Sequence, residues 1–269
     1  MWKRRRNVPK GFSKKGQLFL ELLLSHPADY PLHISNYLIW YCVNAPDLID
    51  LIFLKDPFDW IFRYENKYHF SISTTTNLKP LMNQLPWFKT NLVLIFERSD
   101  SWPDLAEFFT NFRSLETNEP IDSFNTYNIL LLTRKTFNFP GRDNPKIIQL
   151  PDHSLPKRYR HLRGGINFGM LKENKIVSFA AAPHILERSI HGSDYSFALL
   201  RGIETQILER RQGYAEMTVK TLCNELFFRY NIKKIFIWVE RRNLPAVSMY
   251  NKLGFKRVGE VFATYCDLK

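Results

Sequence analysis

The sequence predicts an α/β layer fold, and the prediction rests on three features of its second half. From about residue 166 onward, short apolar runs alternate with segments of helical periodicity. Turn residues stand where the helical segments begin and end, and the resulting order is β-β-β-α-β-α-β. This alternation is typical of a sheet covered by helices.

The first four elements of that half follow from turns and periodicity. Glu173-Asn174-Lys175 separates two apolar runs, so residues 168–172 and 176–182 are predicted to form a hairpin. A third strand is expected within residues 195–207. Residues 213–230 are predicted to be a helix because one face collects mostly apolar residues at a spacing of about 3.6. That face comprises Thr218, Val219, Leu222, Cys223, Leu226, Phe227 and Tyr230.

Three residues define the last helix. Asn243 is a plausible N-cap, Pro245 lies in the first turn, and Gly254 suits the left-handed position that follows a helix. The apolar run at 235–239 is expected to be a buried strand before this helix, and residues 256–266 form strand after it.

The first half of the chain gives weaker patterns, because its apolar runs are shorter and less regular. We expect helices at 17–24 and 34–43, a hairpin of 60–65 and 68–73 about Asn66-Lys67, a strand at 91–96, a helix at 104–113 and a strand at 127–132.

Proline marks the boundary between the two halves. Residues 140, 145, 151 and 156 are all prolines, which are excluded from the interior of a long helix or a central strand. We therefore predict a basic tail at 1–15, an N-terminal domain at 16–145, a linker at 146–165 and a C-terminal domain at 166–269.

Composition and charge narrow the class of protein. With 45% hydrophobic and 15% aromatic residues, the chain can form real cores and does not resemble a disordered protein. Its net charge of +12 is uneven: residues 1–15 hold seven basic residues and no acidic one, residues 16–150 are net −4, and residues 151–269 are net +9. Positive charge on the second half suits a polyanionic ligand. The tail is interpreted as a solvated extension, with nucleic-acid binding as the alternative.

Cysteines and apolar runs predict the cellular setting. Cys42, Cys223 and Cys266 are far apart and odd in number, which indicates neither a disulfide framework nor a metal cluster. The apolar runs 18–24 and 37–43 are far shorter than the roughly 20 residues of a membrane-spanning helix. We therefore expect a cytoplasmic location, no membrane association and no metal.

The most informative segment combines a strand end, a basic turn and a helix start. It contains the pattern Arg-x-x-Gly-x-Ala at Arg210, Gly213 and Ala215. The first four N–H groups of a helix have no partner within it, and with the helix dipole they attract phosphate. Gly213 lets a ligand approach without a Cβ in the way, while Arg210 and Arg211 add cationic donors and Gln212 a neutral donor. The alternative is an ordinary strand–turn–helix.

A second segment, about thirty residues on, carries Asn243, Ala246, Tyr250, Gly254 and Phe255. In this order and at this separation, the two segments resemble the acyl-CoA-binding core of the GNAT superfamily of N-acetyltransferases. The family pattern is Gln/Arg-x-x-Gly-x-Gly/Ala, followed by Asn-x-x-Ala-x-x-x-Tyr-x-x-x-Gly-Phe. The resemblance covers the predicted C-terminal domain and implies a mixed, mostly antiparallel sheet flanked by helices.

The organisation of the whole chain is similar to two-domain members such as the glycine N-acyltransferases, which pair a degenerate first half with a CoA-binding second half. Glu65-Asn66-Lys67 and Glu173-Asn174-Lys175 stand at equivalent places in two hairpin-strand-helix-strand runs. This likeness favours two tandem GNAT-like halves, with an acceptor-side domain of other origin as the alternative. Residues 97–104 are acidic and lack glycine, so we expect one CoA site, in the second half.

The resemblance implies acetyl-CoA as co-substrate and gives roles to individual residues. Ile203, Glu204 and Thr205 match the strand that contacts the pantetheine arm. Asn243 matches an asparagine that hydrogen-bonds this arm, with a plain N-cap as the alternative. Tyr250 matches the tyrosine that protonates the leaving thiolate, which suits a phenol with an ordinary pKa near 10, with core packing as the alternative. The diphosphate turn comprises Arg210, Arg211, Gln212, Gly213, Tyr214 and Ala215.

The general base does not carry over from the family. Many members have an acidic residue five positions before the motif asparagine, and here that position is Trp238. Glu204 is the catalytic base that we favour, with Glu240 and His184 as alternatives. A water chain, or an amine that arrives already neutral, also stays open.

We therefore predict an N-acyltransferase that transfers an acetyl group from acetyl-CoA to a primary amine by direct attack. The acceptor would be a small molecule or a peptide, and the protein a monomer or homodimer. The alternative is a CoA-binding regulatory protein without catalysis, to which Trp238 gives weight. A basic nucleic-acid-binding module is the alternative that we disfavour.

Overall fold

The computed structural model describes residues 49–54, 60–64, 67–71, 92–96, 102–138, 146–155, 162, 164–190 and 193–269. The basic tail at 1–15, the helices expected at 17–24 and 34–43, and Cys42 lie outside these residues. Within the described part, no helix is long and apolar enough to cross a membrane. The chain divides into two compact units, Met1–Tyr127 with Gly259–Lys269 and Asn128–Val258.

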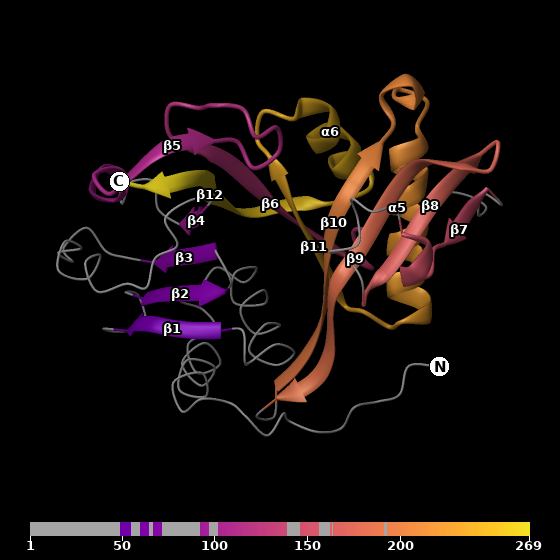
Figure 1. The fold of residues 1–269 in the computed structure, drawn as a ribbon. Helices are drawn as coiled ribbons and strands as arrows, with labels where there is room; N and C mark the ends of the chain where they lie inside the picture. The colour runs from indigo at the N-terminus through magenta and orange to yellow at the C-terminus, as the bar shows by residue number, and fades with distance from the viewer. Residues whose placement is uncertain are drawn as a thin grey trace. The chain divides into compact units, whose positions relative to one another are not determined.

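The first unit contains a sheet whose strands come from distant parts of the chain (Figure 1). β2 pairs antiparallel with β1 and β3, β3 pairs parallel with β4, and β4 pairs antiparallel with the C-terminal strand β12. The predicted hairpin and the strand predicted at 91–96 are therefore confirmed. These strands are β1 (Ile49–Leu54), β2 (Trp60–Tyr64), β3 (Lys67–Ser71), β4 (Leu92–Phe96) and β12 (Lys256–Leu268).

The helix predicted at 104–113 is wrong. A short helix, α4 (Trp102–Ala106), is followed by strand β5 (Phe109–Arg113). β5 pairs antiparallel with β12, more than 150 positions away in the sequence, and fully buries Phe109. Phenylalanine and threonine fit a half-buried strand, so pairing with a distant strand outweighs the local pattern.

Aromatic side chains form the core of the first unit. Phe96 of β4 stacks on Phe262 of β12 at 5.6 Å and meets Phe124 edge-on at 5.1 Å. Trp102 of α4 lies 5.6 Å from the same Phe96 ring. Each such contact contributes about 0.5–1.5 kcal/mol beyond the burial of area, so the cluster fixes β12 against β4.

The second unit is the α/β layer structure that the sequence predicts. From Asn128, β6 lies beside β11, and the order continues β10-β9-β8-β7. Only the β10–β11 pair is parallel among the pairs of β7 to β11, which confirms a mixed, mostly antiparallel sheet. Its elements are β6 (Asn125–Thr133), β7 (Ile147–Gln149), a 3₁₀-helix (Asp152–Ser154), β8 (Ile166–Lys172), β9 (Lys175–Ile190), β10 (Ser193–Thr205), a second 3₁₀-helix (Ile207–Glu209), α5 (Tyr214–Asn224), a π-helix (Glu225–Arg229), β11 (Lys234–Glu240) and α6 (Leu244–Lys252).

The compact units differ in extent from the predicted domains. The second unit begins at Asn128, and the segment predicted as a linker, 146–165, contains β7 and the first 3₁₀-helix. The division into tail, N-terminal domain, linker and C-terminal domain stays a prediction.

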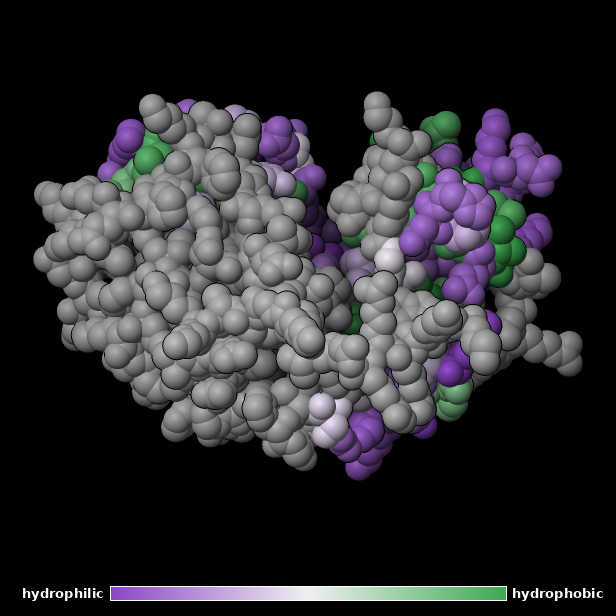
Figure 2. All heavy atoms as spheres, turned by 60° about the horizontal axis from the view of Figure 1, so that its bottom comes forward, coloured by the Kyte–Doolittle hydropathy of each residue, from purple (hydrophilic) through white to green (hydrophobic). Residues whose placement is uncertain are grey.

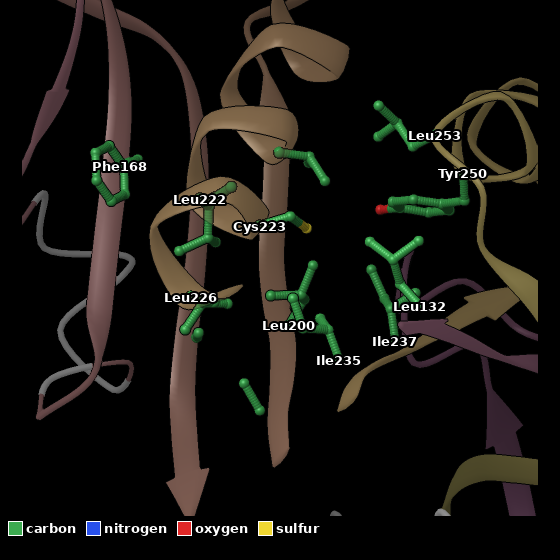
Figure 3. Close-up of a cluster of buried hydrophobic side chains, with 14 of the residues drawn as sticks. Leu132, Phe168, Leu200, Leu222, Cys223, Leu226, Ile235, Ile237, Tyr250 and Leu253 are labelled. Atoms are coloured by element: carbon green, nitrogen blue, oxygen red, sulfur yellow. The ribbon is translucent and has the colours of Figure 1, made fainter. Parts of the chain in front are cut away.

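The helix predicted at 213–230 continues as a π-helix after Asn224. Its predicted apolar face is buried: Figure 3 shows Leu222, Cys223 and Leu226 in one cluster with Leu200 and Ile235 of the sheet. Burial raises the pKa of the Cys223 thiol, so this side chain acts as a small apolar group. The helix therefore covers one face of β8, β9 and β10.

Gly254 ends α6 in the left-handed conformation, with φ 96°, as predicted. A Cβ at this position would lie 1.7 Å from the backbone oxygen of Thr136. The same corner is closed by Asn138, whose N–H and side-chain amide donate to the carbonyls of Leu253 and Lys252. The end of α6 is therefore packed directly against the segment after β6.

Gly254→Ala should destabilise the protein far more than Gly164→Ala. Both positions have positive φ, but a Cβ at Gly164 meets nothing within 4 Å. Backbone strain alone costs about 1–2 kcal/mol, and we expect the clash with Thr136 to bring Gly254→Ala above about 3 kcal/mol. Thermal and denaturant unfolding of both variants measures the difference. Equal losses would contradict the packing described for this corner.

Candidate active site

The central feature of the site is the early end of the ladder between two parallel strands, which we call the opening. β10 and β11 pair from Phe197↔Lys234 to Leu200↔Ile237, and their ladder ends there. Beyond this point β10 continues to Thr205 in contact with β9, while β11 runs on to Glu240. The two strands diverge toward their C-terminal ends (Figure 1). From residue 201 onward, β10 therefore lies outside the β10–β11 ladder.

A bulge lies at the point where the strands part. The register between β10 and β9 shifts between Leu199 and Arg201 and again between Arg201 and Glu204. Gly202 sits inside this bulge with φ 64°, and a Cβ there would lie 2.5 Å from a methyl carbon of Leu162. Sequence reasoning missed Gly202, although a glycine inside a strand is a known signal of a bulge.

The bulge decides which face each following residue occupies. Leu200 and Ile203 pack with the cluster that contains Tyr250. Glu204 lies opposite Phe179, which belongs to a separate cluster on the other face of the sheet. Because paired residues of antiparallel strands share a face, the half-buried Glu204 points away from the face of Tyr250.

The turn before α5 presents unpaired backbone donors. Gly213 is the N-cap residue in the left-handed conformation, with φ 77°, and no side chain caps the helix. The helical ladder opens with the N–H of Met217 donating to Gly213 at 3.0 Å, so the N–H groups of Tyr214, Ala215 and Glu216 have no partner within the helix. A Cβ at Gly213 would meet nothing within 4 Å, which leaves open space for an anion.

Two side chains of this turn are engaged within the protein. Arg210 Nε donates to the carbonyl of Thr205 at 3.2 Å, and Gln212 Nε2 donates to the Glu209 carboxylate at 3.2 Å. Arg211, whose φ is 64°, is exposed. The structure therefore brings residues 203–215 together as one continuous strand–turn–helix corner, in which backbone N–H groups are the main donors.

Asn243 caps α6 as predicted. Its Oδ1 accepts the N–H of Ala246 at 3.3 Å, and its carbonyl accepts the N–H of Val247 at 3.0 Å. The cap uses the side-chain oxygen and leaves the amide nitrogen as a donor. Capping and binding of a ligand are therefore compatible at this residue.

Tyr250 is 3% exposed and lies in the main core cluster of the second unit. Its ring meets Phe255 edge-on at 5.4 Å. Figure 3 shows the hydroxyl pointing toward the side of α5, with Leu132 and Ile237 beneath the ring. The ring packs in the core, while the oxygen reaches toward the space between α6 and α5.

The candidates for the general base, and Trp238 at the family's position for it, lie on three different strands near the opening. Trp238 follows Ile237 directly and is half-buried, so an indole stands at the first position beyond the β10–β11 ladder. Glu240 ends β11, and its carbonyl accepts the N–H of Asn243 at 2.9 Å. His184 is 7% exposed and lies opposite Leu199 on β9. Glu204 lies on β10 four residues beyond the end of the ladder with β11.

The molecular surface around this unit is mixed in character (Figure 2), with hydrophilic and hydrophobic side chains interspersed over the part of the second unit that this view displays.

Residues 133–255 match the acetyltransferase (GNAT) family, so the chain contains a GNAT acetyltransferase domain. An N-alpha-acetyltransferase of Saccharolobus solfataricus is 26% identical over 137 residues, which cover 46% of this chain and 81% of that protein. The residues that match the family include both sequence motifs, at 210–215 and 243–255.

Two solved structures resemble nearly the whole chain. A GNAT-family acetyltransferase of Novosphingobium aromaticivorans matches with a TM-score of 0.58 and 14% identity, covering 91% of this chain and 99% of that one. A tandem GNAT protein of the clavulanic acid biosynthesis pathway matches with a TM-score of 0.51 and 11% identity, covering 97% of each chain. At this identity the likeness concerns the fold alone. Two tandem halves, and a glycine N-acyltransferase-like arrangement, stay predictions.

Gly213→Ala should weaken the binding of CoA, whereas Gly164→Ala should not. Both glycines have positive φ and open space where a Cβ would stand, so both variants carry the same strain of about 1–2 kcal/mol. Only Gly213 lies at the start of α5. We expect the dissociation constant for CoA, measured by calorimetry, to rise at least about tenfold in Gly213→Ala alone. Similar dissociation constants in both variants would show that this turn does not bind CoA.

Asn243→Ser and Asn243→Ala should separate capping from binding. Serine keeps an acceptor for the Ala246 N–H, so we expect near-wild-type stability, while alanine costs about 1 kcal/mol. Both variants lack the amide donor, so both should raise the KM for acetyl-CoA by a similar factor. A normal KM for acetyl-CoA in Asn243→Ser would show that Asn243 caps the helix and does not bind the ligand.

Proposed function

We propose that this protein is an N-acyltransferase that moves an acetyl group from acetyl-CoA to a primary amine by direct attack. The observation that carries the proposal is the parting of β10 and β11 beyond Leu200 and Ile237, next to an uncapped helix start. The strand and the helix start together suit a ligand that has an extended arm and an anionic end.

The donor side of the proposed site has two parts. The N–H groups of Tyr214, Ala215 and Glu216, with the positive end of the α5 dipole, would hold the diphosphate. The part of β10 that lies beyond the β10–β11 ladder, at 203–205, would receive the extended pantetheine arm through backbone hydrogen bonds, as a sheet edge receives a strand. The Asn243 amide nitrogen would donate to the same arm.

The proposed chemistry forms one C–N bond and breaks one C–S bond. Glu204 would take a proton from the attacking amine, and the Tyr250 hydroxyl would give its proton to the departing thiolate sulfur. Backbone N–H groups along the parted edge of β10 would donate to the carbonyl oxygen as it gains charge. Holding both reactants in the opening supplies orientation, which lowers the barrier further.

The acceptor class is the least constrained part of the proposal. The relative from Saccharolobus solfataricus carries the name N-alpha-acetyltransferase, so α-amines of peptides and amino acids are the first acceptors to test. Trp238, which stands where many family members have an acid, favours a second candidate, a CoA-binding regulatory protein without turnover.

Two measurements on the full chain test the proposal. Calorimetry with CoA and acetyl-CoA measures binding, and release of free thiol from acetyl-CoA in the presence of a panel of peptides, amino acids and polyamines measures transfer. We expect micromolar binding and acceptor-dependent thiol release. Binding without release on any acceptor would favour the regulatory candidate, and no binding would overturn both.

Tyr250→Phe should lower kcat about 10²-fold with little change in the KM for acetyl-CoA, because it removes the acid but keeps the ring against Phe255. Tyr230→Phe is the matched control, since Tyr230 packs against the same cluster from the far end of the π-helix. Steady-state rates across pH, with melting curves for both variants, are the measurement. An unchanged rate for Tyr250→Phe at every pH would exclude the acid role.

A further inference from the structure

The Glu209 carboxylate connects the diphosphate turn to the end of β8. Its two oxygens accept from Lys172 Nζ at 2.9 and 3.0 Å, and Oε2 also accepts from Gln212 Nε2 at 3.2 Å. Lys172 is the last residue of β8, and Gln212 directly precedes Gly213. One carboxylate therefore joins a rigid strand end to the residue before the uncapped helix.

The other end of the turn is fixed by backbone contacts. Gln206 donates its N–H to Val177 at 2.9 Å and its side-chain amide to Ile176 at 2.6 Å. Between Gln206 and Gly213 the chain crosses a single 3₁₀-helix whose apolar residues point outward: Ile207 and Leu208 are 76% and 92% exposed. Because packing contributes little here, polar contacts have to hold the second half of the turn.

A carboxylate beside a phosphate site is unfavourable unless its charge is offset. Lys172 provides this offset, and the hydrogen bond to Glu209 raises the pKa of Lys172 above its ordinary value. The lysine is therefore charged at neutral pH, and its ion pair with Glu209 weakens at strongly alkaline pH as the lysine loses its proton. An exposed pair of this kind contributes little to global stability. The Lys172–Glu209 pair instead fixes the local geometry of the turn.

We propose that Glu209 is a positioning residue: it holds Gln212, and with it the N–H groups at the start of α5, against the β8 end in the orientation that receives the diphosphate. This inference rests on the proposed function, because it assigns a role within the same site. A turn that is ordered before binding loses less conformational entropy when the ligand arrives.

Calorimetry with CoA and steady-state kinetics with acetyl-CoA test this role in the full chain. We expect Glu209→Ala to weaken CoA binding and raise the KM about tenfold, with kcat within about twofold of the wild type. Glu209→Gln should stay within about threefold, because its amide oxygen still accepts from Gln212 and Lys172. Glu225→Ala is the control: it removes a similar pair, with Arg229 at 3.3 Å, from the π-helix.

The outcomes separate this inference from the proposed function. Wild-type protein that binds no CoA overturns the proposed function and this inference with it. Wild-type binding with unchanged or tighter binding in Glu209→Ala overturns the positioning role alone, since tighter binding means that the carboxylate only repels phosphate. If Glu209→Ala does not fold, Lys172→Met replaces it. A loss of affinity for CoA that persists at high salt would support the positioning role. A loss that high salt abolishes would overturn it, because salt screens repulsion between the Glu209 carboxylate and phosphate.

Discussion

The early end of the β10–β11 ladder is the constraint on which the site depends. Two parallel strands that paired to their ends would close the sheet and bury their backbone groups against each other. Here pairing with β11 stops at Leu200 and Ile237, while β10 stays paired with β9 across the bulge at Gly202. In the proposed site, this part of β10 would bind the extended arm of the ligand.

Both sides of the opening are held by the helices that follow the strands. The first turn of α5 and the last turn of α6 are joined by Lys252 Nζ and the Glu216 carboxylate at 2.8 Å. Glu216 also places negative charge in the first turn of α5, which the helix dipole favours. At the same end of α6, Gly254 lets the helix stop against Thr136. The uncapped N–H groups and Tyr250 are therefore fixed relative to the same sheet.

Local signals in the sequence predicted much of the second unit, and non-local pairing explains the errors. The cap at Asn243 and the left-handed Gly254 depend on residues next to them, so the sequence shows them directly. The strand at Phe109–Arg113 exists because it pairs with β12, which no local pattern reveals. The contacts of Gln212 with Glu209, and the bulge at Gly202, also depend on where other strands end. The sequence therefore identifies candidate site residues more readily than it predicts the side-chain contacts that these residues make.

The bulge also sets the relation between the proposed acid and base. With regular alternation after Leu200, Glu204 would share a face with Leu200 and Tyr250. The extra residue at Gly202 shifts the phase, so Ile203 takes that face and Glu204 lies opposite Phe179. In the proposed mechanism the two groups would therefore act from opposite faces of the sheet, Glu204 on the attacking amine and Tyr250 on the departing thiolate sulfur.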